Sequence, residues 1–247
     1  MCQFKSGIIL KDRVFVPDYD SHTDMLEELK INDSYANAKT LFVRAELIPK
    51  NYDVFSDVSE WTFKVDQDIV PEWFVAEYEK ERMIEAVKAW AKDHIFIGVD
   101  NLNLGPGKSF YVKNCKNVTA RENSSVEARE NSSVVAWENS SVVARENSSV
   151  VAWGNSSVEA RENSSVVARE NSSVVAWENS SVVAWGNSSV VAWGKSIVVK
   201  DRWSSFNTDR LVLSENSTFK DCVTRTLYQS GDFKLVSVAD GKIKREV

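Results

Sequence analysis

Apolar and polar positions alternate along the middle of the chain in a unit of eight residues. From Asn123 to Gly194 the unit N-S-S-V-[V/E]-A-[R/W]-[E/G] occurs nine times in succession, with a Val and an Ala two positions apart in every copy. A spacing of two is the period of a β-strand with one buried face. The Asn and the Glu or Gly before it are typical of turns. A short strand and a tight turn, repeated at a fixed step, predict a β-solenoid.

The number of octads in one coil decides which side chains share a surface, because a single strand cannot close on itself. Positions two, four and six of the octad (Ser, Val and Ala) are expected to face inward, and positions three, five and seven outward. Val and Ala are small, which favours two closely packed sheets and two octads, or 16 residues, per coil. Three octads per coil remain the alternative, and they place Arg121, Arg145 and Arg169 in one column.

The segments that flank the perfect repeats differ from them in composition. Residues 1–98 lack the octad and predict a small α+β head, followed by a linker at 99–106 and the octapeptide-repeat solenoid at 107–200. Residues 201–247 predict a degenerate coil and a C-terminal β cap, with strands at 227–228 and 233–236. Atypical ends are expected of a solenoid, since a bare end exposes unpaired strand edges and core.

Within the head, the patterning changes between the period of a strand and the period of a helix. Polar residues that cap helices, and a proline that opens one, mark where the helices begin. The predicted elements are two short strands around residues 11–12, a helix capped by Ser21 or Thr23, strands at 41–47 and 61–66, and a helix from Pro71 to about His94.

Composition restricts the classes of function. The formal net charge is −6 and the pI is near 5.2, whereas proteins that bind nucleic acid or anionic membranes are typically basic. No stretch approaches the roughly 20 apolar residues of a membrane helix, and the first residues lack the pattern of a secretory leader. The three cysteines form no CxxC pair. We therefore expect a cytoplasmic protein with reduced thiols, no cofactor, and neither nucleic acid nor membrane as a partner.

The densest cluster of polar side chains lies in residues 18–24. There Asp20, His22 and Asp24 offer groups that ligate a divalent cation or act as a base beside a hydroxyl. The partners that such a site would use are Arg44, Glu46, Asp66 and Asp68. The same residue types are also expected at a turn and a helix N-terminus that carry no site. The sequence leaves both interpretations open and favours a protein that is not an enzyme.

Positions five and seven of the octad vary, and they predict an interaction surface. Outward Val and Trp side chains in register form an apolar patch of a kind that soluble monomers seldom leave uncovered. The alternative is that Trp only stacks on the coils above and below it, because it has a high β-propensity. The expected contact residues are Trp137, Trp153, Trp177, Trp185, Trp193, Val175, Val183, Val191, Arg129, Arg145 and Arg161.

Two resemblances rest on these motifs. The head segments FKSGIILKDRVFVPDYDSHTDMLEEL and KVDQDIVPEWF, followed by octads and a short cap, resemble uncharacterised octapeptide-repeat proteins of gut bacteria and their phages. That resemblance covers nearly the whole chain and implies an architecture, and a virion-associated location for a phage-encoded chain, but no chemistry. The period of eight is also similar to that of bacterial ice-nucleation proteins, whose outward Thr-x-Thr pairs are replaced here by other residues.

Three functions are consistent with these features. The first is a non-enzymatic structural or interaction protein, in which a rigid solenoid is a spacer or display surface and its Trp and Val columns contact a protein partner or a second copy. The second is an enzymatic or metal-binding head around Asp20, His22 and Asp24, with the solenoid as a stalk. The third is a solenoid that binds ice or another surface. We expect the first.

Overall fold

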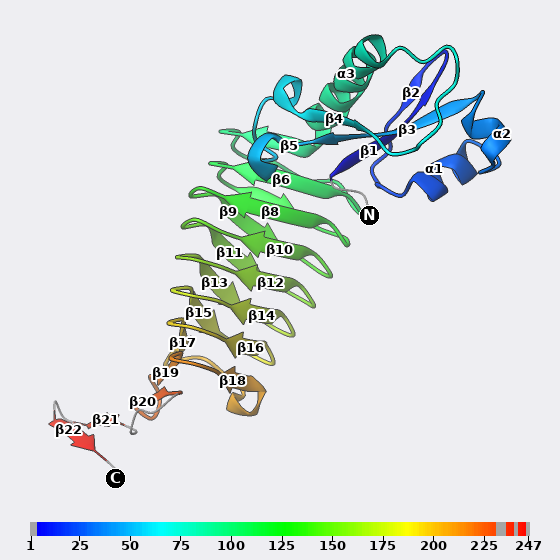
Figure 1. The fold of residues 1–247 in the computed structure, drawn as a ribbon. Helices are drawn as coiled ribbons and strands as arrows, with labels where there is room; N and C mark the ends of the chain where they lie inside the picture. The colour runs from blue at the N-terminus through cyan, green and yellow to red at the C-terminus, as the bar shows by residue number, and fades with distance from the viewer. Residues whose placement is uncertain (1–3, 231–235, 240–241, 246–247) are drawn as a thin grey trace. The chain divides into compact units, whose positions relative to one another are not determined.

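The computed structural model describes residues 4–230, 236–239 and 242–245, with side chains over residues 4–230. The chain divides into two compact units, Met1–Ile95 and Phe96–Val247. A small α/β region forms the N-terminal part, and a β-solenoid of about seven turns extends over residues 95–199 (Figure 1). The prediction of a solenoid that follows a small N-terminal region of helices and strands is therefore confirmed. Among the described residues, no helix is long and apolar enough to cross a membrane.

The N-terminal unit is built on a four-stranded antiparallel sheet with the strand order β2-β1-β3-β4. Its helices lie between and after these strands in the chain. The elements in order are β1 (Lys5–Leu10), β2 (Val14–Phe15), α1 (His22–Glu28), α2 (Tyr35–Ala38), β3 (Phe42–Ile48), η1 (Lys50–Tyr52), η2 (Val58–Glu60), β4 (Thr62–Val65) and α3 (Ala76–His94).

Helices cover both faces of this sheet, which explains why all six residues of β1 are buried. On one face, Ile8 packs in a cluster with Met25 and Leu26 of α1. On the other face, a side chain at Gly7 would place its Cβ 2.9 Å from Cε of Met83 in α3, so only glycine fits. Because side chains alternate along a strand, residues 6, 8 and 10 of β1 and residues 42, 44 and 46 of β3 share the α1 face.

The two helix starts differ in how well their sequence signals predict them. Helix α1 begins after Ser21, whose Oγ accepts the backbone N–H of Asp24 at 3.3 Å, as the capping pattern predicts. Helix α3 begins at Ala76 and not at Pro71. Residues 71–74 form a separate turn, closed by the Phe74 N–H and the Pro71 carbonyl, and the extended backbone of Val75 (φ −120°, ψ 107°) interrupts the helical path.

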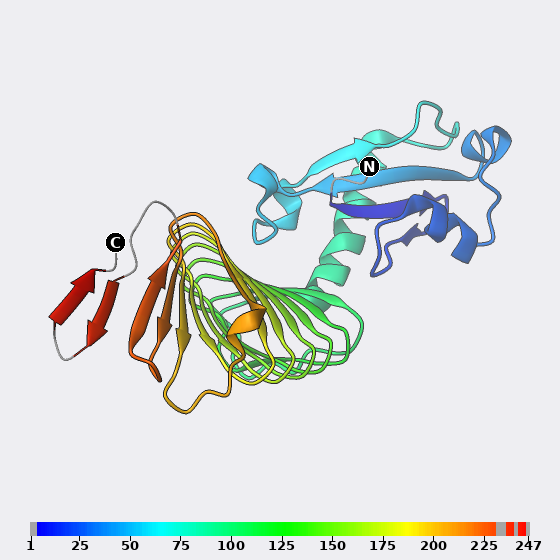
Figure 2. The same cartoon turned by 90° about the horizontal axis from the view of Figure 1, so that it is seen from below.

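Short parallel strands in two sheets make up the solenoid (Figures 1 and 2). The eight-stranded sheet contains β5 (Ile95–Ile97), β6 (Ser109–Lys113), β8 (Ser125–Arg129), β10 (Ser141–Ala144), β12 (Ser157–Ala160), β14 (Ser173–Ala176), β16 (Ser189–Ala192) and β18 (Leu211–Leu213). The solenoid part of the second sheet contains β7 (Val118–Ala120), β9 (Ser133–Ala136), β11 (Ser149–Ala152), β13 (Ser165–Ala168), β15 (Ser181–Ala184) and β17 (Ile197–Lys200).

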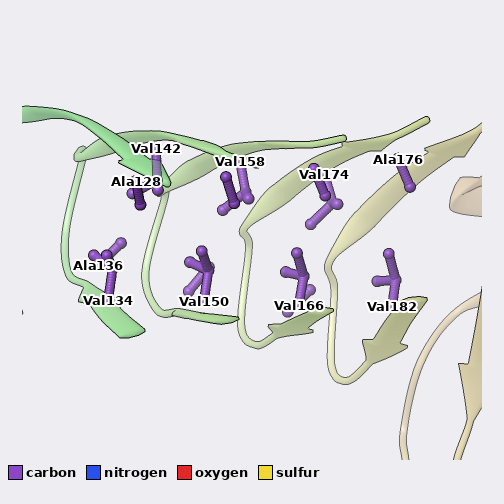
Figure 3. Packing of buried hydrophobic residues seen from close by; sticks show 14 of the residues in the cluster. Ala128, Val134, Ala136, Val142, Val150, Val158, Val166, Val174, Ala176 and Val182 are labelled. Carbon is purple, nitrogen blue, oxygen red and sulfur yellow. The ribbon is translucent and has the colours of Figure 1, made fainter. Parts of the chain in front are cut away.

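The pairing register explains how the sheets stack. Ser141 pairs with Ser125 on one side and Ser157 on the other, so 141 − 125 and 157 − 141 both equal 16 residues. Viewed from below, the turns lie over one another (Figure 2). Val158 and Ala160 are 3% and 0% exposed, and the Ser before each strand is buried with them. Figure 3 shows the Val and Ala side chains of the two sheets meeting in a core of small residues.

The first turn of the solenoid begins earlier than the sequence predicts. Residues 99–106, expected to form a linker, are joined to the following turn by backbone hydrogen bonds. The N–H of Asn101 donates to the Lys116 carbonyl at 2.8 Å, and the N–H of Leu104 donates to the Thr119 carbonyl at 2.9 Å. Leu104 is buried in the solenoid core. The octad is absent here, so the backbone pairing of this segment leaves no signal in the sequence.

Left-handed residues close the turns between strands. The last octad position is a Glu or a Gly with positive φ at most turns, for example Glu138 at 63° and Gly154 at 66°. The carboxylate of Glu162 accepts the N–H of Glu146 in the preceding turn at 3.0 Å. This bond helps to explain why a residue other than glycine is held in a conformation that costs about 1–2 kcal/mol.

Aromatic side chains replace Val and Ala where the repeats end. Phe206 and Phe219 are buried, with ring centroids 6.4 Å apart, and the ring of Tyr228 stacks on Phe219 at 5.7 Å. The second sheet continues through these residues as β19 (Thr218–Asp221), β20 (Thr226–Gln229), β21 (Val236–Ala239) and β22 (Lys242–Arg245), and η3 (Thr208–Arg210) precedes β18. Strands β19 to β22 pair antiparallel. Part of the strand expected at 233–236 lies outside the described residues.

Candidate functional site

The polar cluster predicted at residues 18–24 does not converge on one point. Asp20 accepts bonds from Nζ of the buried Lys5 at 2.8 Å and from the N–H of Ser6 at 3.0 Å. Asp24 is an exposed residue in the first turn of α1. Only His22 turns inward, with 6% of its surface exposed. The reason is helical geometry: residues two apart on a helix lie on different sides of it.

The predicted partners of this cluster also separate. Arg44 forms an ion pair with Asp33, and its guanidinium lies 5.0 Å from the ring centroid of Phe42. Asp68 is exposed. Glu46 and Asp66, in contrast, come together with His22, and the ligand atoms of all three lie within 4.8 Å of one another. The structure thus joins three of the predicted residues in a grouping different from Asp20, His22 and Asp24.

A backbone carbonyl orients the His22 imidazole. Nε2 lies 3.3 Å from the carbonyl oxygen of Ala45, which only accepts hydrogen bonds, so the proton of a neutral His22 belongs on Nε2. Nδ1 then carries a lone pair and faces Asp66, whose Oδ2 is 3.5 Å away. That separation exceeds the usual N–H···O range of about 2.7–3.2 Å. The ring is therefore held with a free ligand atom toward the two carboxylates.

Glu46 is fully buried, and neither of its carboxylate oxygens has a hydrogen-bond partner. Ser6 stands directly opposite Glu46 in the β1–β3 pairing, and its buried Oγ also lacks a partner. The nearest cation is Nζ of Lys64, which is 3.7 Å from Oε2 of Glu46 and 3.7 Å from Oδ1 of Asp66. Buried polar groups are nearly always satisfied, so two unsatisfied neighbours on one sheet face require an explanation.

The residues predicted to form an interaction surface lie in two rows, one on each sheet of the solenoid. In each row, a side chain at octad position seven stacks on the one a turn away. We call the row along the second sheet the Arg121 ladder, and it consists of Arg121, Trp137, Trp153, Arg169 and Trp185. We call the row along the eight-stranded sheet the Arg129 ladder, and it consists of Arg129, Arg145, Arg161, Trp177 and Trp193.

In the Arg121 ladder, aromatic and cationic side chains contact one another in sequence. The rings of Trp137 and Trp153 stack at 5.3 Å with 7° between their planes. The guanidinium of Arg169 lies between two rings, 4.6 Å from Trp153 and 5.6 Å from Trp185. Such cation–π contacts contribute about 0.5–1 kcal/mol at exposed sites. The column Arg121, Arg145 and Arg169, expected for three octads per coil, is not formed, since Arg121 lies over Trp137.

The Arg129 ladder changes character along its length. Its first part is charged: Arg129 and Arg161 form ion pairs with Glu127 and Glu159, both at 2.6 Å. Its last part is apolar, with the rings of Trp177 and Trp193 stacked at 5.4 Å. A shallow groove of about 430 Å³ on the same sheet face is lined by Val143, Glu159, Val175 and Trp177, among others. Trp137 and Trp177 are the most exposed ladder tryptophans, at 37% each.

Sequence reasoning missed Ser6 and Lys64, the other polar residues of the head cluster. Ser6 lies in a buried strand, and only the register Ser6–Glu46 brings it to the site. Lys64 lies on β4, two residues before Asp66, and alternation along that strand would have placed both on one face. Of the cysteines, Cys115 and Cys222 are free, and Cys2 lies outside the described residues.

Comparison of the chain with protein-family models, curated proteins and solved structures finds no match.

Proposed function

We propose that this chain is a non-enzymatic interaction protein whose solenoid is a rigid display surface. The observation that carries the proposal is the pair of ladders, in which Trp and Arg side chains stack on the outside of the solenoid beside rows of outward Val. An apolar surface of this extent usually contacts another molecule. Aromatic and Arg side chains are also the residues enriched at protein interfaces.

The proposal includes the way in which the octads build this surface. Two octads form one coil, so that residues 16 apart share a ladder, and the strands after Phe206 close the far end as a cap. The 16-residue register and the aromatic residues at the end of the core support these statements. A cap is needed because a bare end would expose strand edges for pairing with other chains.

A second copy of the chain is the partner that we propose. The Arg129 ladder offers both signs of charge beside an apolar end, so two copies in antiparallel orientation would match Glu127 and Glu159 with Arg145 and Arg161. The equal rung spacing of two identical solenoids lets the contacts repeat along the seam, as an isologous interface requires. A different protein partner is the other outcome of the test.

The setting also belongs to the proposal. A cytoplasmic or virion-associated location, like the resemblance to octapeptide-repeat proteins of gut bacteria and their phages, is supported by the free thiols of the two described cysteines.

The experiment compares the wild type with a triple variant, Trp177→Ser, Trp185→Ser and Trp193→Ser, by light scattering after gel filtration. The control is Trp203→Ser, because Trp203 is 80% exposed but belongs to neither ladder. The proposal predicts an associated wild type and control, and a folded monomeric triple variant with an unchanged far-UV circular dichroism spectrum. A wild type that is monomeric, or a triple variant that associates as the wild type does, overturns it.

A further inference from the structure

We propose that the N-terminal unit binds a divalent transition-metal ion through His22, Glu46 and Asp66. The inference is independent of the ladders and of association, since all three residues lie on the α1 face of the N-terminal sheet. It rests on the convergence of three ligand atoms within 4.8 Å and on the complete burial of a carboxylate that has no hydrogen-bond partner.

The buried Glu46 is the observation that separates this cluster from an ordinary group of acidic residues. A carboxylate without a partner in a protein interior is unfavourable unless a cation or donor compensates it. Lys64, 43% exposed and 3.7 Å away, is too distant to donate a hydrogen bond. A metal ion bound at about 2.0–2.2 Å would compensate both carboxylates directly.

The donor set indicates the class of ion. One imidazole nitrogen and two carboxylates suit zinc, manganese or iron, whereas calcium and magnesium prefer oxygen ligands only. The Ala45 carbonyl supplies the outer contact that metal-bound histidines usually have, and it leaves Nδ1 as the ligand. Asp66 is 38% exposed and is the ligand with most freedom to move toward the ion.

Access from solvent is through the same exposed side. Asp66 and Lys64 border it, and three protein ligands leave a fourth position of a tetrahedral ion for water or a small ligand. Lys64 approaches both carboxylates in the absence of the ion, so its ammonium group competes with metal for the same oxygens. Removal of this charge should therefore strengthen metal binding.

The test is calorimetric titration of the full chain with ZnCl2, with MgCl2 as the hard-cation comparison. The proposal predicts one zinc ion per chain, little heat with magnesium, and at least a tenfold loss of zinc affinity in Glu46→Gln, Asp66→Asn and His22→Ala. Lys64→Met should bind zinc more tightly than the wild type. Asp24→Asn is the matched control, since Asp24 is an acidic residue of the same helix that lies outside the cluster.

Two measurements keep the result interpretable. Circular dichroism shows that each variant is folded, and Asp66→Asn, at a partly exposed position, tests the site even if a buried variant unfolds. Cobalt substitution adds a visible absorption spectrum that reports nitrogen and oxygen ligands and should disappear in His22→Ala. Absence of zinc binding in the wild type, or an equal loss of affinity in Asp24→Asn and Asp66→Asn, overturns the assignment.

Discussion

The buried serines at octad position two provide a sharp test of how the solenoid is stabilised. Ser156 and Ser172 precede neighbouring strands of the same sheet, and both are fully buried. The hydroxyl of Ser156 donates to the Trp153 carbonyl at 2.7 Å and also lies 3.2 Å from the Glu138 carbonyl. The hydroxyl of Ser172 has no partner. The same substitution, Ser to Ala, therefore removes a satisfied hydroxyl at one position and an unsatisfied one at the other.

The expected effects have opposite signs. Ser156→Ala loses a buried hydrogen bond, with a net loss of about 0.5–1.5 kcal/mol, and no carbon atom, so it creates no apolar cavity. Ser172→Ala removes a hydroxyl whose burial is uncompensated, so its stability should be equal to or greater than that of the wild type. The two variants should differ by about 1 kcal/mol or more, which is roughly a fivefold difference in the unfolding equilibrium constant.

Urea unfolding, followed by tryptophan fluorescence and circular dichroism, measures this difference. The midpoints are comparable when the dependence of unfolding free energy on urea is the same for all three proteins. The reasoning is refuted if Ser172→Ala is destabilised as much as Ser156→Ala, because the stability would then not depend on the carbonyl contact.

Three further predictions concern the turns, the register and the N-terminal unit. Gly154→Ala should lower the urea midpoint, since φ is 66° and the new Cβ would lie 3.2 Å from Cα of Glu138, whereas Gly105→Ala, with open space around it, should not. Cysteines introduced as Ser141→Cys and Ser157→Cys should form a disulfide on oxidation, because these residues pair directly, while Ser141→Cys with Ser165→Cys should not. Burial and a hydrogen bond to Glu28 raise the pKa of Tyr19 from 10.0 to about 12, so the folded protein retains a proton that the unfolded chain releases. Stability should fall as the pH rises from 10 to 12, and Tyr19→Phe should remove that part of the decrease; an unchanged slope contradicts the assignment.

The solenoid could be predicted from the sequence because its signal is local. A period of two within each octad places Val158 and Ala160 on the same face, and both are buried. The extent of the first turn could not be predicted, since residues 99–106 join it through backbone hydrogen bonds that any side chains permit. The start of α3 was predicted too early because Pro71 opens a turn that the backbone of Val75 separates from the helix.

The head cluster shows where local reasoning fails. His22, Glu46 and Asp66 are 24 and 20 residues apart in the chain, and they meet only because of strand order and register in an antiparallel sheet. The sequence pointed to each residue but grouped His22 with its neighbours Asp20 and Asp24. In β3, strand alternation predicts one solvent-facing side, yet α1 packs over part of that face and Glu46 is buried.

Sedimentation equilibrium of the wild-type chain over a roughly hundredfold range of concentration tests the central claim most directly. If the ladders contact a second copy, the apparent mass should rise reversibly from 27.8 kDa toward twice that value, and the Trp177, Trp185 and Trp193 triple variant should remain at 27.8 kDa. A wild type that stays at 27.8 kDa at every concentration contradicts the claim.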